Sequence, residues 1–234
     1  MFGISVSPHA KAYLGPFVVF MLLLAVGEGV AHIGDGLATW WLAEPKYWVF
    51  PLQTVVCAVA LAWWWREYRF ATGNSAWWSL LIGIAVGILA LGVWVSPQWL
   101  FHAERRLGGF DPWFTYGQAG TQAWHIPLRV LRLVLVVPLL EEIFWRGFLL
   151  RHLIRDPFHE VPVGAFTWMS FTLVSLAFGL AHWGPDFVPA IITGALYNLV
   201  AISTRSLGAC VLAHAVTNLG LGLYIFRTQQ WGFW

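Results

Sequence analysis

Residues 77–95 read WWSLLIGIAVGILALGVWV, a run without a single charged side chain. A helix needs about 20 mostly apolar residues to cross the hydrocarbon core of a bilayer. The two tryptophans that begin the run, Trp77 and Trp78, are typical of the boundary between lipid and water. We therefore interpret this stretch as a membrane-spanning helix.

The rest of the chain has the same character. Hydrophobic residues make up 59% of the 234 positions and charged residues only 10%, whereas an ordinary soluble domain carries about 25% charged residues. So few charges could not cover a surface in water, and a net charge of +2 gives no reason to expect a nucleic-acid partner. The sequence predicts an all-α integral membrane protein with one membrane domain over residues 1–234.

Seven apolar stretches are long enough to be spans, so we expect a bundle of seven transmembrane helices. They are residues 13–32, 47–65, 77–95, 127–150, 163–182, 187–203 and 207–226. An eighth span is possible if part of residues 96–126 enters the bilayer. That stretch contains Pro97, Gly108, Gly109 and Pro112, which do not allow one continuous helix, so an interfacial loop is the preferred interpretation.

Ionisable side chains at membrane depth are costly, and they face a bundle interior or a wet cavity. Three predicted spans carry such groups in short patterns. The span 127–150 contains Pro-Leu-Leu-Glu-Glu-Ile-Phe-Trp-Arg-Gly, with the charged residues Glu141, Glu142 and Arg146. The span 163–182 ends in Phe-Gly-Leu-Ala-His, from Phe178 to His182.

The third pattern is His-Ala-Val-Thr-Asn, from His214 to Asn218. Residues four apart share a helix face, so His214 and Asn218 should project together. Glu142 should pair with Arg146 in the same way and give structural support. Glu141 has no cation four residues further on, and we predict that it is chemically distinct from its neighbour.

A carboxylate, two imidazoles and a carboxamide on three spans could hydrolyse a peptide bond if the spans converge. An unpaired Glu141 in a low-dielectric cavity is a stronger base than in water, and His182 could help hold the attacking water. His214 and Asn218 offer N–H donors for a developing oxyanion. Each pattern alone is also explained by packing or by an interfacial position; their joint occurrence favours catalysis. Phe178 and Asn198 are predicted to line the same cavity.

The ordered set Glu-Glu-x-x-x-Arg, Phe-x-x-x-His and His-x-x-x-Asn resembles the CPBP family, which includes type II CAAX prenyl endopeptidases and bacteriocin-processing proteins. The resemblance covers about residues 127–226, the expected catalytic core. It implies an all-helical membrane endopeptidase in which Glu141 and His182 activate water and His214 and Asn218 line the oxyanion site. The Gly-Gly-Phe-Asp-Pro run at 108–112 resembles a bacterial subgroup associated with exosortase systems, which implies the bacterial cytoplasmic membrane.

The resemblance leaves the metal question open, because the family has been described both as metalloproteases and as metal-free glutamate proteases. A zinc ion could take Glu141, His182 and His214 as ligands. We prefer a site without a cofactor, because Asn218 beside His214 suits an oxyanion donor better than a ligand shell.

The expected partners are the bilayer and a protein or peptide substrate with a membrane-anchored or C-terminal segment. Two other functions fit buried Glu and His residues: an ion-coupled transporter, and a catalytically silent membrane chaperone or immunity factor. A transporter would favour broken helices in paired repeats, and the two halves of this sequence show no such correspondence.

Overall fold

The computed structural model describes residues 7–36, 39–70, 75–116, 119–120 and 125–234. The fold is all-α and membrane-embedded, with one minimal hairpin in which β1 (Thr115–Tyr116) pairs with β2 (Ala119–Gly120). The main helices are α1 (Pro8–Gly34), α3 (Lys46–Trp63), α4 (Ala76–Leu100), α8 (Trp168–Ala181), α9 (Phe187–Thr204) and α10 (Leu207–Thr228). Short helices are α2 (Trp40–Ala43), η1 (Trp65–Glu67), η4 (Phe158–Glu160) and η5 (Trp231–Phe233).

The predicted span 127–150 forms a run of short helical segments between residues 125 and 152, which we call the central helix. Its segments are α5 (His125–Leu131), η2 (Arg132–Val136), α6 (Val137–Glu142), η3 (Ile143–Leu149) and α7 (Leu150–His152). The segments η2 and η3 are π-helical, and the others are α-helical.

Polar side chains determine where several helices begin. The hydroxyl groups of Ser75, Thr167 and Ser206 each accept a hydrogen bond from the backbone N–H three residues later, at the starts of α4, α8 and α10. At the C-terminal end of α9, Arg205 takes a left-handed conformation with φ 52°. Such a residue ends a helix by turning the chain away from the helical path.

Each predicted span contains helix, with differences in length. Five helices are long and apolar enough to cross a membrane, namely α1, α3, α4, α9 and α10, while α8 has 14 residues. The predicted range 163–182 was too long at its start. Gly164 has φ +80° there, and a Cβ atom on it would lie 2.2 Å from the Ala201 carbonyl oxygen. Within the described part of residues 101–124 there is no helix that could form an eighth span.

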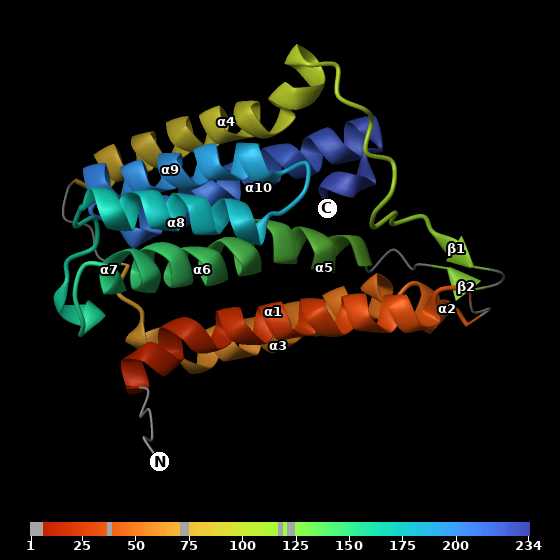
Figure 1. Ribbon diagram of the computed structural model, residues 1–234, viewed down its shortest axis with the longest axis horizontal. Helices are drawn as coiled ribbons and strands as arrows, with labels where there is room; N and C mark the ends of the chain where they lie inside the picture. The colour runs from red at the N-terminus through yellow and green to blue at the C-terminus, as the bar shows by residue number, and fades with distance from the viewer. Residues whose placement is uncertain (1–6, 37–38, 71–74, 117–118, 121–124) are drawn as a thin grey trace.

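The central helix lies between two helical layers (Figure 1). On one side are α1 and α3, and on the other are α4, α8, α9 and α10. Each layer contributes its own apolar core, and both cores reach the central helix. This arrangement gives the polar residues of the central helix neighbours on both sides.

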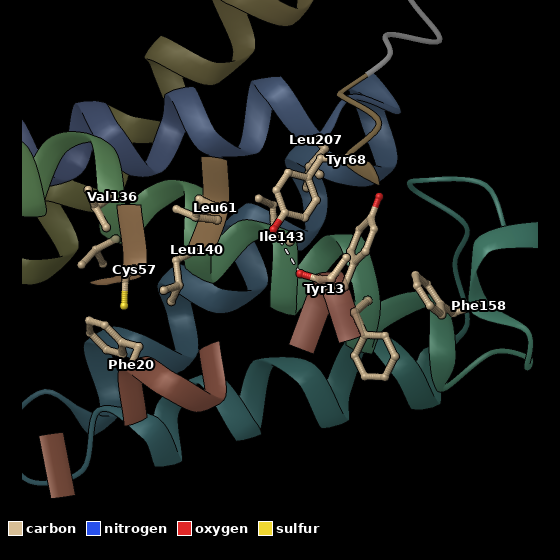
Figure 2. Close-up of a cluster of buried hydrophobic side chains, with 13 residues drawn as sticks. Tyr13, Phe20, Cys57, Leu61, Tyr68, Val136, Leu140, Ile143, Phe158 and Leu207 are labelled. Atoms are coloured by element: carbon tan, nitrogen blue, oxygen red, sulfur yellow. Dashed lines mark hydrogen bonds between the residues drawn. The ribbon is translucent and has the colours of Figure 1, made fainter. Parts of the chain in front are cut away.

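The first core joins α1 and α3 to the central helix through Tyr13, Leu61 and Leu140, among others (Figure 2). The Tyr68 hydroxyl donates to the Ala12 carbonyl at 3.1 Å. The side chain of Gln53, in α3, donates to the Phe20 carbonyl of α1 at 2.8 Å. Outward side chains such as Leu22 and Val59 are about 60% exposed, as expected for surfaces that face lipid.

The chain after α4 packs against the C-terminal segment. Arg106 forms a bidentate ion pair with Asp186 at 2.6 and 2.7 Å, and its backbone carbonyl accepts from the Gly232 N–H. Trp99 and Phe101 remain more than 70% exposed, which fits the predicted interfacial loop. Phe110 differs from the predicted interfacial position: it is only 2% exposed, and its ring packs against that of Tyr47 with the ring centres 4.8 Å apart and the planes tilted by 40°.

Candidate active site

The central helix changes its hydrogen-bond register just before the two glutamates. The Val137 N–H donates to the Arg132 carbonyl five residues earlier. In that register the next donor would be Pro138, whose nitrogen has no hydrogen, so the Leu133 carbonyl loses its helical partner. A second π-helical stretch, η3, follows Glu142. Such interruptions are frequent at functional sites.

Glu142 and Arg146 form the predicted ion pair. Their side chains are both fully buried, and Arg146 Nη1 lies 3.1 Å from Glu142 Oε1. The guanidinium also donates to Asn198 Oδ1 at 3.0 Å and to the Gly194 carbonyl at 2.8 Å. The prediction that Glu142 is locally paired is therefore confirmed, and the pair ties the central helix to α9.

His214 contacts this ion pair directly, which the sequence did not predict. Its Nδ1 lies 2.9 Å from Glu142 Oε1, and its side chain is 7% exposed. An ionised carboxylate can only accept hydrogen bonds, so Nδ1 must carry the proton. In the neutral ring Nε2 is then an acceptor, and it becomes a donor only when the imidazole is protonated. Glu142 therefore holds a hydrogen on His214 Nδ1 and leaves Nε2 facing other partners.

Glu141 faces a cavity of about 280 Å³ between the central helix, α1, α8 and α10. The walls include all four predicted catalytic residues, Glu141, His182, His214 and Asn218. The Glu141 carboxyl has one buried oxygen, Oε2, that finds no hydrogen-bond partner among the residues that the structure describes. The two adjacent glutamates thus have different surroundings, as predicted.

His182 follows the last residue of α8, and its ring lies edge-on to Trp94. Its Nδ1 is 2.9 Å from the Phe178 carbonyl oxygen. A carbonyl can only accept, so Nδ1 carries the hydrogen and Nε2 is left as an acceptor in the neutral ring. An acceptor at this position suits a bound water molecule.

Asn218 reaches from α10 to the register change in the central helix. Its Nδ2 donates to the Leu133 carbonyl at 2.9 Å, the group that Pro138 leaves without a helical donor. One of the two amide hydrogens is used in this way. The second amide hydrogen remains for a ligand in the cavity.

The two predicted lining residues differ. Phe178 lines the cavity, whereas Asn198 does not: it is fully buried, and its side-chain amide donates to Ser175 Oγ at 3.1 Å. The expectation for Asn198 was wrong because its polar atoms are needed by Arg146 and by α8. Asn198 supports the site indirectly, by accepting a hydrogen bond from Arg146.

The possible zinc ligands Glu141, His182 and His214 are not assembled as a ligand set. In the described part of the chain no three His, Cys, Asp or Glu side chains are grouped so that they could hold a metal ion. The residues present therefore do not fit the zinc site considered from the sequence.

Two further residues, Arg129 and Arg132, were not predicted. Both are buried in the central helix, with 3% and 9% of their surface exposed, and Arg132 lines the cavity. The signal in the sequence is the same as for Glu141: a charged residue inside the predicted span 127–150.

The family model described as "Type II CAAX prenyl endopeptidase Rce1-like" matches residues 123–220, which include the central helix and every predicted catalytic residue. No curated protein and no solved structure matches the chain.

Proposed function

Because the chain belongs, through residues 123–220, to the Rce1-like type II CAAX prenyl endopeptidase family and is a membrane peptidase, we propose a specific reaction and mechanism for it. It hydrolyses a peptide bond of a membrane-associated protein or peptide, with Glu141 as the base. The observation that carries this proposal is the shared cavity, where Glu141, His182, His214 and Asn218 meet from three helices.

In the first step Glu141 takes a proton from a water molecule, whose oxygen attacks the carbonyl carbon of the peptide bond. His182 Nε2 accepts the second hydrogen of that water and orients it. The unpaired Glu141 Oε2 and the tautomer set by the Phe178 carbonyl support these roles.

The attack places a negative charge on the former carbonyl oxygen. Protonated His214 donates from Nε2 to this oxyanion, and Asn218 donates through its second amide hydrogen. The C–N bond then breaks, and the leaving amine takes the proton that Glu141 holds. The products are a carboxylic acid and an amine, and Glu141 is returned to its starting state.

This mechanism uses no metal. Water is activated by Glu141, and the oxyanion receives two donors, which is the role that a Lewis acid would otherwise fill. Removing divalent metal from purified protein should leave turnover unchanged. Stoichiometric zinc, with activity lost on stripping and restored on return, would overturn this part of the proposal.

The substrate is a protein or peptide with a membrane-anchored or C-terminal segment, because the cavity lies among helices that face lipid. We place the protein in a bacterial cytoplasmic membrane on the basis of the Gly-Gly-Phe-Asp-Pro run at 108–112. The same resemblance implies that the substrate need not be prenylated.

The test is a comparison of membrane-protein termini in cells that carry the wild-type protein or Glu141→Ala. New termini should appear only with the wild type. Glu28→Ala is the matched control, since it removes an exposed carboxylate from α1 that does not line the cavity. Identical termini in wild-type and Glu141→Ala cells would contradict the proposed function.

A further inference from the structure

Four arginines lie in the central helix, and they fall into two groups of two that differ in their hydrogen bonding. In Arg146 and Arg151 all three guanidinium nitrogens donate hydrogen bonds, the latter to the carbonyls of Gly147, His159 and Val161. In Arg129, Nε and Nη1 are buried and have no hydrogen-bond partner in the described part of the chain. Within the described residues neither Arg129 nor Arg132 has a carboxylate within ion-pair distance. Two buried cations therefore lie about one helical turn apart with no carboxylate in ion-pair contact among the described residues, although the charge of Glu141 acts on Arg132 from further away.

Arg129 is enclosed by aromatic rings. Its guanidinium carbon lies 4.5 Å from the centre of the Phe50 ring, 5.1 Å from Phe110 and 5.3 Å from Trp234. Ring faces stabilise a cation but do not neutralise it. The positive charge of Arg129 therefore adds to the potential around Arg132.

Arg132 lies on the wall of the cavity. Its Nε and Nη2 both donate to Gln53 Oε1, at 3.1 and 2.7 Å, which fixes the plane of the guanidinium. No hydrogen bond is made by Nη1 within the described residues. Val137 and Glu141 line the same cavity, so it extends along one face of the central helix from Arg132 to Glu141.

We infer that Arg132, oriented by Gln53 and backed by the charge of Arg129, binds a carboxylate of the substrate and positions the peptide against Glu141. This inference rests on the proposed peptidase function. A guanidinium donates in a planar fork that matches a carboxylate, and within the described residues the only side-chain acceptor bonded to Arg132 is the neutral amide oxygen of Gln53, which favours an anionic ligand. The carboxylate belongs either to the C-terminus of the substrate or to an Asp or Glu side chain.

The spacing limits where this carboxylate lies. Arg132 and Glu141 are nine positions apart on the central helix, which is at most about 13 Å of rise because the π-helical segment η2 rises less per residue than an α-helix. An extended peptide covers that distance with about four residues. We therefore expect the carboxylate no more than about four residues beyond the bond that is cut.

The experiment uses three pools of lipid-anchored peptides whose last positions are random uncharged residues. The first pool ends in a free carboxylate, the second in an amide, and the third in an amide with one Asp near the end. Wild-type protein in proteoliposomes is given the pools in competition, and products are counted by mass spectrometry. The wild type should cleave one carboxylate pool roughly 10- to 100-fold better than the neutral pool.

Arg132→Gln should bring this ratio close to one. Arg151→Gln is the control: it removes a buried arginine that does not line the cavity, so it should reduce yield and keep the ratio. Preference for the first or the third pool identifies the terminus or a side chain as the source. Equal cleavage of all pools by the wild type, or a preference that survives Arg132→Gln, would overturn the inference.

A second variant tests the inference if Arg132→Gln is not a folded protein. If Arg132→Gln does not fold, Arg132→Lys keeps the charge without the fork, and its ratio should fall between those of the wild type and of a neutral side chain. A ratio equal to that of the wild type would argue against the inference.

If no pool is cleaved, the proposed function fails for these peptides, and binding is measured by the melting temperature of Glu141→Gln. A rise with the carboxylate pools that is lost in Glu141→Gln/Arg132→Gln would keep the inference without the peptidase. No rise, or a rise only with anionic phospholipid, would overturn it.

Discussion

His214 Nδ1 lies 2.9 Å from Glu142 Oε1, the same oxygen that receives Arg146 Nη1 at 3.1 Å. One buried carboxylate oxygen thus links the structural ion pair to a histidine of the candidate active site. Glu142 therefore has two tasks: it compensates a buried arginine, and it holds the proton on His214 Nδ1. Substitutions at Glu142 should affect both stability and turnover.

Glu142→Gln should lower the melting temperature in detergent, because breaking a buried ion pair by removing one partner costs about 3–5 kcal/mol. Arg146→Met alone should do similar damage, and the double variant should recover part of the stability. Turnover should not recover with it, since His214 still lacks its carboxylate. Full recovery of turnover in the double variant would separate His214 from Glu142 functionally.

Glu141→Gln should abolish hydrolysis while the protein still inserts and folds, because Glu141 Oε2 has no partner to lose. Arg146→Met should give Glu141→Gln no gain in stability, in contrast to Glu142→Gln. The measurement is a double-mutant cycle on melting temperature beside a cleavage assay. If Glu141 rather than Glu142 couples to Arg146, the roles of base and structural partner are reversed.

Asn218→Ala should lower turnover by roughly 10²–10³ through loss of an oxyanion donor. It should also cost about 1 kcal/mol of stability, because the Leu133 carbonyl loses its hydrogen bond. Adding Pro138→Ala supplies a backbone N–H in the register of that carbonyl, so it should restore stability but not turnover. Pro138→Ala alone is the reference variant. If adding Pro138→Ala to Asn218→Ala restored turnover as well as stability, Asn218 would have no role in the chemistry.

Gly109→Ala should destabilise the contact between the loop after α4 and the C-terminal segment. Gly109 has φ +139°, and a Cβ atom there would lie 2.2 Å from the Trp231 carbonyl oxygen. We expect the free energy of unfolding to fall by about 1–3 kcal/mol, which is measured as a lower melting temperature. Gly108→Ala is the control, because a Cβ atom at Gly108 meets nothing within 4 Å. Equal melting temperatures for the two variants would show that this contact does not stabilise the protein.

The sequence alone determined the membrane fold and the unlike character of the two glutamates. Long apolar runs have only one stable solution in lipid, which is a helix whose backbone groups are satisfied internally. Spacing by four within a helix is equally local, so the pairing of Glu142 with Arg146 could be predicted without knowledge of any other span.

Tertiary structure alone decided which groups meet across helices. Three hydrogen bonds illustrate this: His214 with Glu142, Arg146 with Asn198, and Arg132 with Gln53. Each joins residues that are more than 50 positions apart in the sequence. Periodicity specifies the face of a helix but not the partner of that face. The partner depends on how the layers around the central helix pack, and packing is a property of the whole chain.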